Sequence, residues 1–100
     1  MPEGEVEVVD RPDRLRYEAL VGETIAGFLE YRISRDRIAL IHTEVQPAFE
    51  GQGIGAALVR FALDDARRRG LRVIPICPYV KRYLERHPEH RDIVVGMSPP

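Results

Sequence analysis

The stretch Val45-Gln46-Pro47-Ala48-Phe49-Glu50-Gly51-Gln52-Gly53-Ile54-Gly55-Ala56 carries the strongest structural signal in this chain. It follows an apolar run and begins a segment with helical periodicity. Its three glycines allow positive φ angles and leave the backbone free of side chains. The first N–H groups of a helix lack intrahelical acceptors and lie at the positive end of the helix dipole. The stretch therefore predicts a loop that holds a phosphate or pyrophosphate through backbone amides.

Upstream of this loop, the sequence has the two-residue period of β-strands. A short strand around residues 6–9 must end at Pro12. Segment 14–21 predicts a half-buried strand, with Arg16 and Glu18 on its outer face. Its apolar face is formed by Leu15, Tyr17, Ala19 and Val21.

After a turn at Gly22-Glu23, segment 24–33 predicts another strand. One side of that strand carries Ile25, Leu29, Tyr31 and Ile33. Segment 38–45 is almost continuously apolar, which is typical of a central strand covered on both faces. Tight turns between these segments predict an antiparallel meander.

Downstream of the loop, apolar residues recur at helical spacing from Gly53 to Arg69, and Gly70 ends this helix. Segment 71–77 is a strand that we expect to pair in parallel with segment 38–45 through a right-handed crossover. A short helix over 79–87 and a closing element over 89–95 follow. We therefore expect one α+β domain over 1–100, a mixed central sheet with packed helices, and a flexible tail at 96–100.

Composition restricts the function classes. The 100 residues carry a formal net charge of −1, and no basic stripe with interleaved aromatic residues is present, which disfavours nucleic acid as a partner. Cys77 is the only cysteine, so an internal disulfide is excluded. No apolar run is long enough to cross a membrane and no leader pattern appears, so we expect a cytoplasmic protein without a membrane partner. No metal site is predicted.

Glycine loops have several interpretations. Gly51, Gly53 and Ala56 match the loose dinucleotide-binding pattern, but the acidic residue that should follow about 20 positions later is missing. The P-loop requires Gly-Lys-Ser or Gly-Lys-Thr, which is absent. A glycine turn that serves only to start the helix is the remaining structural alternative.

Three blocks together resemble the GCN5-related N-acetyltransferase family, and most closely its small, single-domain, Yjdj-type members. The first two blocks are Ile41-His42-Thr43-Glu44-Val45 and Gly51-Gln52-Gly53-Ile54-Gly55. The third is Val73-Ile74-Pro75-Ile76-Cys77-Pro78-Tyr79-Val80 with His87-Pro88-Glu89. The resemblance extends over about residues 17–94, and it implies acetyl transfer from acetyl-coenzyme A to an amine-bearing acceptor.

The resemblance also implies how the cofactor is held. Backbone amides of the loop hold the pyrophosphate, and the strand that ends at Val45 lies along the pantetheine arm. Strands 38–45 and 71–77 splay apart around the thioester, and the Val45 N–H stabilises the oxyanion. The residues implied in cofactor binding are Val45, Gly51, Gln52, Gly53, Ile54, Gly55 and Ala56. Lys81, Arg82 and Arg86 are candidates for the 3′-phosphate, or are surface residues.

Two features depart from the family pattern. Glu50 replaces the usual Gln or Arg, and because a carboxylate repels phosphate, we expect its side chain to turn away from the site. The helical segment that larger members place between their first two strands is missing, and only residues 10–13 occupy that connection. The acceptor side is therefore expected to be open.

Four residues are candidates for the chemistry. An imidazole generally titrates near neutrality, so His42 is a candidate base, or alternatively a buried structural histidine. Glu44 shares its strand face and is a candidate assistant, or only a solvated strand end. Cys77 ends the neighbouring strand and could become a thiolate near a histidine, or be a buried apolar side chain. Tyr83 matches the family position that protonates the leaving thiolate, or packs in the core.

Three function classes follow. The first is a small acetyl-coenzyme A-dependent N-acetyltransferase that transfers the acetyl group directly and acts as a monomer or weak homodimer. A coenzyme A-binding module without catalysis is the second, and a nucleic-acid-binding module is the third, which the net charge disfavours.

Overall fold

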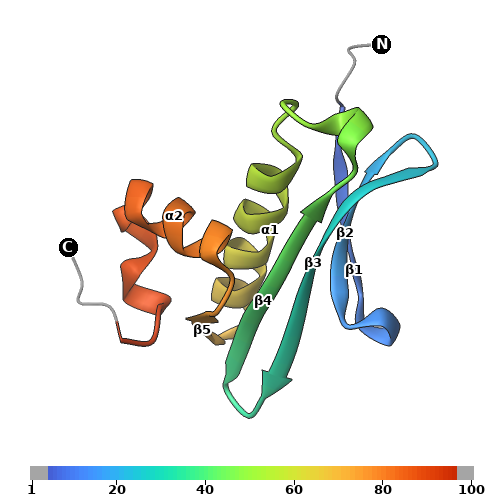
Figure 1. Cartoon of the computed structure of the whole chain (residues 1–100). Coiled ribbons are helices and arrows are strands. Elements are labelled where there is room, and N and C mark those ends of the chain that lie inside the picture. Colours follow the sequence, from blue (N-terminus) through green and yellow to red (C-terminus); the bar gives the residue numbers. More distant parts are fainter. Residues whose placement is uncertain (1–4, 97–100) are drawn as a thin grey trace.

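A computed structural model of the chain describes residues 5–96, so all of the predicted tail at 96–100 except Gly96 lies outside the described residues. Five strands and two α-helices follow one another along the chain (Figure 1). The strands are β1 (Glu7–Arg11), β2 (Arg16–Val21), β3 (Thr24–Ser34), β4 (Arg37–Val45) and β5 (Arg72–Pro75). The helices are α1 (Ile54–Arg69) and α2 (Pro78–Arg86), with 3-10 turns η1 (Pro12–Arg14), η2 (Pro47–Phe49) and η3 (Pro88–Ile93).

The strands form one sheet in the order β1-β2-β3-β4-β5. The first four strands pair antiparallel, and β5 pairs in parallel with β4 after the α1 crossover. The predicted meander and crossover are confirmed. The β4–β5 pairing covers only Arg37–Leu40 and Arg72–Pro75, so the second half of β4 continues without β5 beside it. Because β5 ends at Pro75 and the chain turns into α2 at Pro78, β4 has an open edge where the resemblance implied a splay between the two strands.

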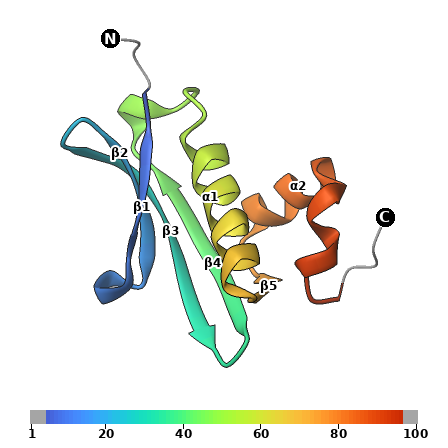
Figure 2. The ribbon, with the colours of Figure 1, turned by 180° about the vertical axis from the view of Figure 1, so that it is seen from behind.

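Helix α1 packs against all five strands and lies on one face of the sheet (Figure 2). Its buried side is built from residues at helical spacing, namely Ile54, Leu58, Val59, Ala62, Leu63 and Ala66. Helix α2 packs against β4, β5 and α1 at the edge of the sheet, with Val80 and Leu84 buried. After η3, a bridge between Val94 and Val73 returns the chain to β5, which forms the predicted closing element.

The opposite face of the sheet differs from the prediction. In Figure 1 strands β3 and β4 stand in front of α1, and among the described residues no helix lies over them. His42 and Glu44 project from this uncovered face, with side chains 54% and 62% exposed. The prediction of a strand covered on both faces is therefore wrong. The apolar run indicates only that most residues of β4 are at least half-buried. Neighbouring strands bury Ala39 and Ile41 in part, without a second layer of described residues over them.

Two residues of the first hairpin also differ. Leu15 was expected to begin the apolar face of β2, but it precedes the strand with φ 57° and is 41% exposed. Glu18 was expected on a solvated face, but its side chain is fully buried. Arg11, Arg14 and Arg16 cover its carboxylate at 2.7–3.1 Å and pay for its burial with ion pairs.

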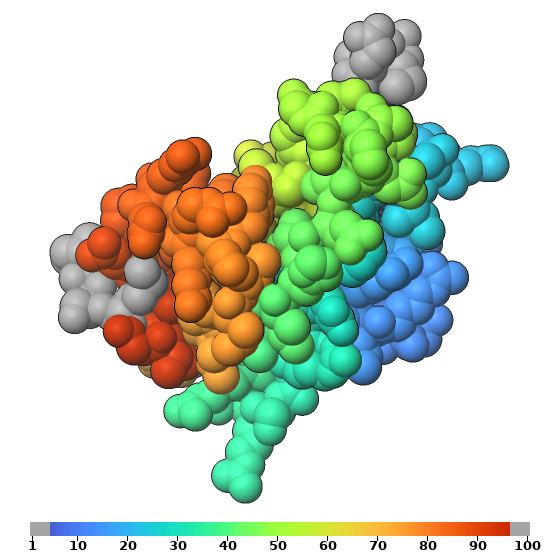
Figure 3. Space-filling view, in the orientation of Figure 1, coloured from blue at the N-terminus to red at the C-terminus, as the bar shows by residue number. Residues whose placement is uncertain are grey.

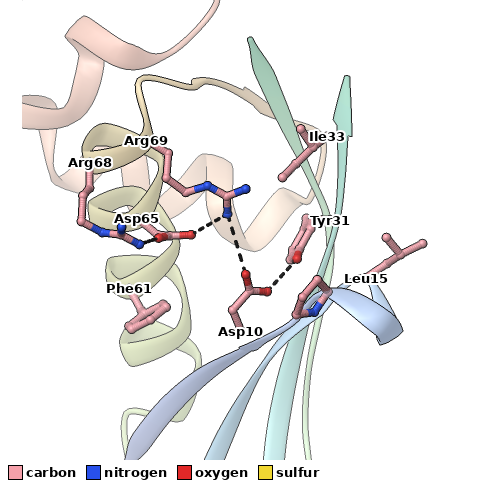
Figure 4. Close-up of a pocket in the computed structure, with 9 residues that line it drawn as sticks. Asp10, Leu15, Tyr31, Ile33, Phe61, Asp65, Arg68 and Arg69 are labelled. Carbon is pink, nitrogen blue, oxygen red and sulfur yellow. Dashed lines mark hydrogen bonds and ion pairs between the residues drawn. The ribbon is translucent and has the colours of Figure 1, made fainter. Parts of the chain in front are cut away.

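The largest hollow lies at the C-terminal end of α1, far along the helix from the glycine loop (Figure 4). Its charged side chains are paired with one another: Arg68 and Arg69 contact Asp65, and Arg69 lies 3.7 Å from Asp10. Asp65 also accepts a hydrogen bond from the Tyr17 hydroxyl at 2.8 Å. These contacts tie α1 to the sheet, so we assign this hollow a structural role. No helix in residues 5–96 combines the length and apolarity needed to span a membrane.

Candidate functional site

The backbone amides of the glycine loop form a continuous series at the start of α1. Gly51 and Gly53 have φ angles of +81° and +80°, in the left-handed region that favours glycine. Gly53 caps α1, and its carbonyl accepts the first intrahelical hydrogen bond, from Ala57 at 3.0 Å. The preceding amides, from Gly51 to Ala56, have no backbone acceptor among the described residues. Six consecutive N–H groups at the helix N-terminus are therefore without a backbone partner, which suits an anion. Gly51, Gln52 and Gly53 are exposed, whereas Ile54 and Gly55 are buried.

Glycine is required at position 55 for a different reason, which is the close approach of another side chain. A Cβ atom at Gly55 would lie 2.9 Å from the ring carbon Cζ and the hydroxyl oxygen of Tyr79. Tyr79, from the first turn of α2, therefore covers the start of α1 in van der Waals contact. The two residues and Val45 line a hollow of about 280 Å³ beside the loop. This hollow joins the amides to the end of β4.

Glu50 is the departure from the family pattern next to these amides. Its side chain forms no capping hydrogen bond to α1, and the residue is exposed and lines the hollow. The direction of its carboxylate stays a prediction. A carboxylate there opposes a bound phosphate, while the backbone groups themselves remain accessible.

A second hollow, of about 160 Å³, lies on the other side of Tyr79. Arg82 and Arg86 line it, and the Arg82 guanidinium carbon is 6.0 Å from the centroid of the Tyr79 ring. Both arginines project from α2 close to Ala56 of the loop. Lys81 is exposed and is not among the residues that line this hollow. The cationic side of the site is thus formed by Arg82 together with Arg86.

The open edge exposes backbone groups of β4. The Gln46 N–H donates to the Ala26 carbonyl of β3 at 2.8 Å. Backbone groups along a strand point alternately to its two sides, so those of His42 and Glu44 also point to β3. The backbone groups of Thr43 and Val45 point the other way. The Thr43 N–H meets the Cys77 thiol, whereas those of Val45 point to the side where β5 has ended. This position suits a ligand that pairs with β4 as an additional strand would.

Cys77 lies at the point where the open edge begins. Its N–H and that of Ile76 both donate to the Leu40 carbonyl, at 2.9 and 3.0 Å. The thiol is 4% exposed and lies 3.4 Å from the Thr43 hydroxyl. Burial acts to raise the pKa of the Cys77 thiol, but hydrogen bonds from the Thr43 hydroxyl and from the backbone N–H groups of Val80, Tyr79 and Thr43 lower it below its usual value.

His42 lies on the other face of β4. Its Nε2 atom is 3.1 Å from a Glu44 carboxylate oxygen, and its ring meets Phe28 edge-on at 6.0 Å between centroids. The alternative of a buried histidine is therefore wrong, and the shared face with Glu44 is confirmed. Successive side chains of a strand point to opposite faces, so Thr43 turns its hydroxyl toward Cys77 while His42 points away from it. The expected cysteine–histidine pair does not form.

Tyr83 is placed beside the second hollow. Its ring stacks on His87 with centroids 4.2 Å apart, and it lines the hollow with Ala56 and Arg82. Burial raises the pKa of the Tyr83 hydroxyl, with a smaller opposing effect from Arg60. Tyr79, rather than Tyr83, shares the first hollow with Val45.

The glycine loop at a helix N-terminus, next to the open edge of a parallel strand pair, defines an acetyltransferase-type domain. Residues 16–93 match the family of GCN5-related N-acetyl-transferases, and the chain belongs to this family. A GCN5-like protein from Staphylococcus aureus, solved by NMR, has the same fold, with a TM-score of 0.69, 24% identity, and coverage of 98% of this chain and 94% of that chain.

A relative in sequence is Protein NATD1 of Xenopus tropicalis. It is 32% identical over 56 residues, which are 56% of this chain and 51% of that protein. The match thus spans about half the length of this relative. The Yjdj-type subgroup stays a prediction.

Three residues of the site were not identified from the sequence. Tyr79 carried a usable signal, because it is an aromatic residue in the first turn of a predicted helix, directly after Pro78. Thr43 and Phe28 carry no sequence signal, because their contacts with Cys77 and His42 depend on strand register. The register in turn includes an irregularity between Glu30 and Tyr31 that shifts the pairing of β3 with β4.

Proposed function

We propose that this chain transfers an acetyl group from acetyl-coenzyme A to a primary amine by direct transfer. The observation that carries the proposal is the run of six unpaired amides, from Gly51 to Ala56, that ends beside the open edge of β4. A phosphate-binding loop that adjoins an unpaired strand edge suits a single ligand with both a pyrophosphate and an amide-containing arm.

The described residues fit coenzyme A. The loop amides would hold the pyrophosphate, and the backbone groups of Val45, with the Thr43 carbonyl, would pair with the pantetheine amides. Arg82 and Arg86 would meet the 3′-phosphate, since they line the hollow next to Ala56. When bound, the cofactor supplies an activated acetyl thioester. The Val45 N–H, which points to the side where β5 has ended, is the proposed hydrogen-bond donor to its carbonyl oxygen.

His42 is the proposed base. An alkylammonium group has a pKa near 10, so the amine must lose a proton before it can attack. An exposed imidazole can accept this proton, and Glu44, at 3.1 Å from Nε2, stabilises the imidazolium that results. A second proton leaves the nitrogen as the new amide forms, and it is delivered to the departing thiolate.

The proposed donor of that second proton is Tyr83, whose raised pKa keeps the hydroxyl protonated at neutral pH. Tyr79 is the competing donor because it shares a hollow with Val45. Phenylalanine variants of the two tyrosines separate them: the true donor loses turnover without losing cofactor affinity. Cys77 is proposed to lie next to the thioester, held by Thr43, without accepting the acetyl group itself.

The test combines binding and turnover. Acetyl-coenzyme A should raise the melting temperature more than free adenine nucleotides or NAD, because a ligand that binds only the native state stabilises it by mass action. Coenzyme A release should follow when amines are added, and His42→Ala should lower turnover by about a hundredfold or more with little change in cofactor affinity. Tight binding without release across a panel of amines and peptides would instead favour the non-catalytic coenzyme A-binding module.

A further inference from the structure

We propose that the acceptor is a polypeptide segment. A lysine of that segment reaches His42, while an acidic residue close to the lysine contacts the arginine cluster of the first hairpin (Arg11, Arg14 and Arg16). This inference rests on the acetyl transfer proposed above and concerns only which amine is used.

The first observation is the uncovered sheet face. Helix α1 and the loop take up the side on which the cofactor would be held, whereas the side chains of His42 and Glu44 are more than half exposed on the other face. In Figure 3 the surface of β3 and β4 lies open, with no helix of the described residues over it. Small-molecule sites are concave and bury most of the ligand surface. A small amine placed on an open strand would touch the protein on one side only. A macromolecular acceptor supplies the missing wall and excludes water from His42 when it docks.

The second observation is the order of charges across this face. Strand pairing places His42, Glu30, Arg16 and Arg11 in one row, and Glu44, Phe28, Glu18 and Val9 in the next. The end of the face nearest the open edge of β4 therefore carries two carboxylates: Glu30, which pairs with Arg32 at 3.2 Å, and Glu44, which lies beside His42. These attract the ammonium group of an incoming amine. Phe28 lies between the two ends, 4.5 Å below the Arg16 guanidinium.

The arginine cluster carries more positive charge than the Glu18 carboxylate neutralises. Its three guanidinium groups share the single carboxylate of Glu18, which is fully buried. Arg14 and Arg11 remain 51% and 42% exposed, so their remaining N–H groups face solvent. Arg11, Arg14, Arg16 and Glu18 together carry a net charge of +2, which Asp13 beside Arg14 lowers to about +1. This part of the face therefore suits a carboxylate of the acceptor.

The separation of the two ends fits a polypeptide. His42 is on β4 and Arg16 is on β2, two strands away, which corresponds to about 10 Å at the usual strand spacing. In an extended peptide, residues i and i+2 point to the same side about 7 Å apart. A lysine and an acidic residue at these positions span the distance with their side chains. The face therefore selects a lysine with a nearby acid.

The experiment uses short peptides with blocked N-termini and one lysine each. The residue two positions from the lysine is Asp, Ser or Arg, and cadaverine is the small-amine probe. With the full chain and acetyl-coenzyme A, we expect kcat/KM to be about two- to fivefold higher for the Asp peptide than for the Ser peptide, mainly through KM, and lowest for the Arg peptide. Without cofactor, the Asp peptide should shift the NMR amide signals of Phe28 and Glu44.

Arg14→Gln is the informative variant, since Arg11 and Arg16 still pair with Glu18 and a melting curve verifies the fold. It should abolish the preference for Asp over Ser. Arg37→Gln, an exposed arginine at the far end of β4, is the matched control and should retain that preference. Equal rates for the three peptides, cadaverine as the best acceptor, or NMR shifts confined to α1 would overturn the polypeptide inference alone. Cofactor binding without turnover of any probe would overturn the transfer reaction as well.

Discussion

Replacing Gly53 by alanine isolates the contribution of the loop backbone. Gly53 caps α1 with φ 80° and ψ 17°, and no atom lies within 4 Å of the position that a Cβ would take. The penalty is therefore conformational, at about 1–2 kcal/mol for an L-residue in the left-handed region. In a domain of this size we expect the melting temperature to fall by about 5–15 °C.

Gly70 provides the matched control at the other end of the same helix. It also caps α1 in the left-handed region, with φ 71° and open space around a Cβ. Gly70→Ala should lower the melting temperature about as much as Gly53→Ala and leave cofactor affinity unchanged. In Gly53→Ala, the amides of Gly53 and Ile54 turn out of the loop, and losing one hydrogen bond to a charged group weakens acetyl-coenzyme A binding by roughly ten- to hundredfold.

Titration calorimetry with acetyl-coenzyme A, beside thermal unfolding, measures both quantities. If the two alanine variants lose affinity equally, the effect is one of stability and not of the loop. If Gly53→Ala binds as tightly as the original chain, the amides do not hold the cofactor, and the reasoning about the site is refuted.

Three further outcomes test other parts of the structure. Gly55→Ala should push the Tyr79 ring aside and lower cofactor affinity by about tenfold in calorimetry, with little loss of melting temperature, because alanine favours a helix by about 1 kcal/mol. Arg82→Gln should weaken binding of coenzyme A but not of its 3′-dephospho form, whereas Lys81→Gln should change neither; equal effects of the two variants would contradict the assignment of the second hollow. Burial acts to raise the pKa of Glu18, but hydrogen bonds from the arginine cluster lower it below its ordinary 4.5. The stability that Glu18 contributes is therefore complete above about pH 4.5 and lost as the pH falls through the lower folded value, so Glu18→Gln should show a shallower acid decline of melting temperature.

The elements that could be predicted from sequence are those whose signals are local. The helix from Gly53 to Arg69 was predicted within one residue, because a left-handed glycine stands at each end and the apolar period lies between them. The meander followed from short alternating segments and tight turns. The contacts of the site depend on register and could not be predicted in this way. Thr43 and Cys77 are 34 residues apart and meet only because β4 and β5 pair over four residues and β5 then ends.

Burial of charge was also beyond a strand-by-strand prediction. Glu18 looks solvated because it alternates with apolar residues, and only the convergence of arginines from β1, η1 and β2 explains why it is buried. The apolar run of β4 led to the opposite error, because it predicted burial on both faces where one face is open. Such a run shows that a strand is central in its sheet, but it cannot show whether a second layer covers it. That distinction decides the position of His42.

The open face has a consequence for how the site works. A charge interaction is several times weaker in contact with water than in a desolvated site, and the pair of His42 and Glu44 is more than half exposed. On the other face of β4, the thiol of Cys77 is buried and surrounded by amides, so the two halves of the site differ in solvation across a single strand. An acceptor that covers His42 removes this difference, which makes docking of the acceptor, and not a preformed pocket, the step that completes the site.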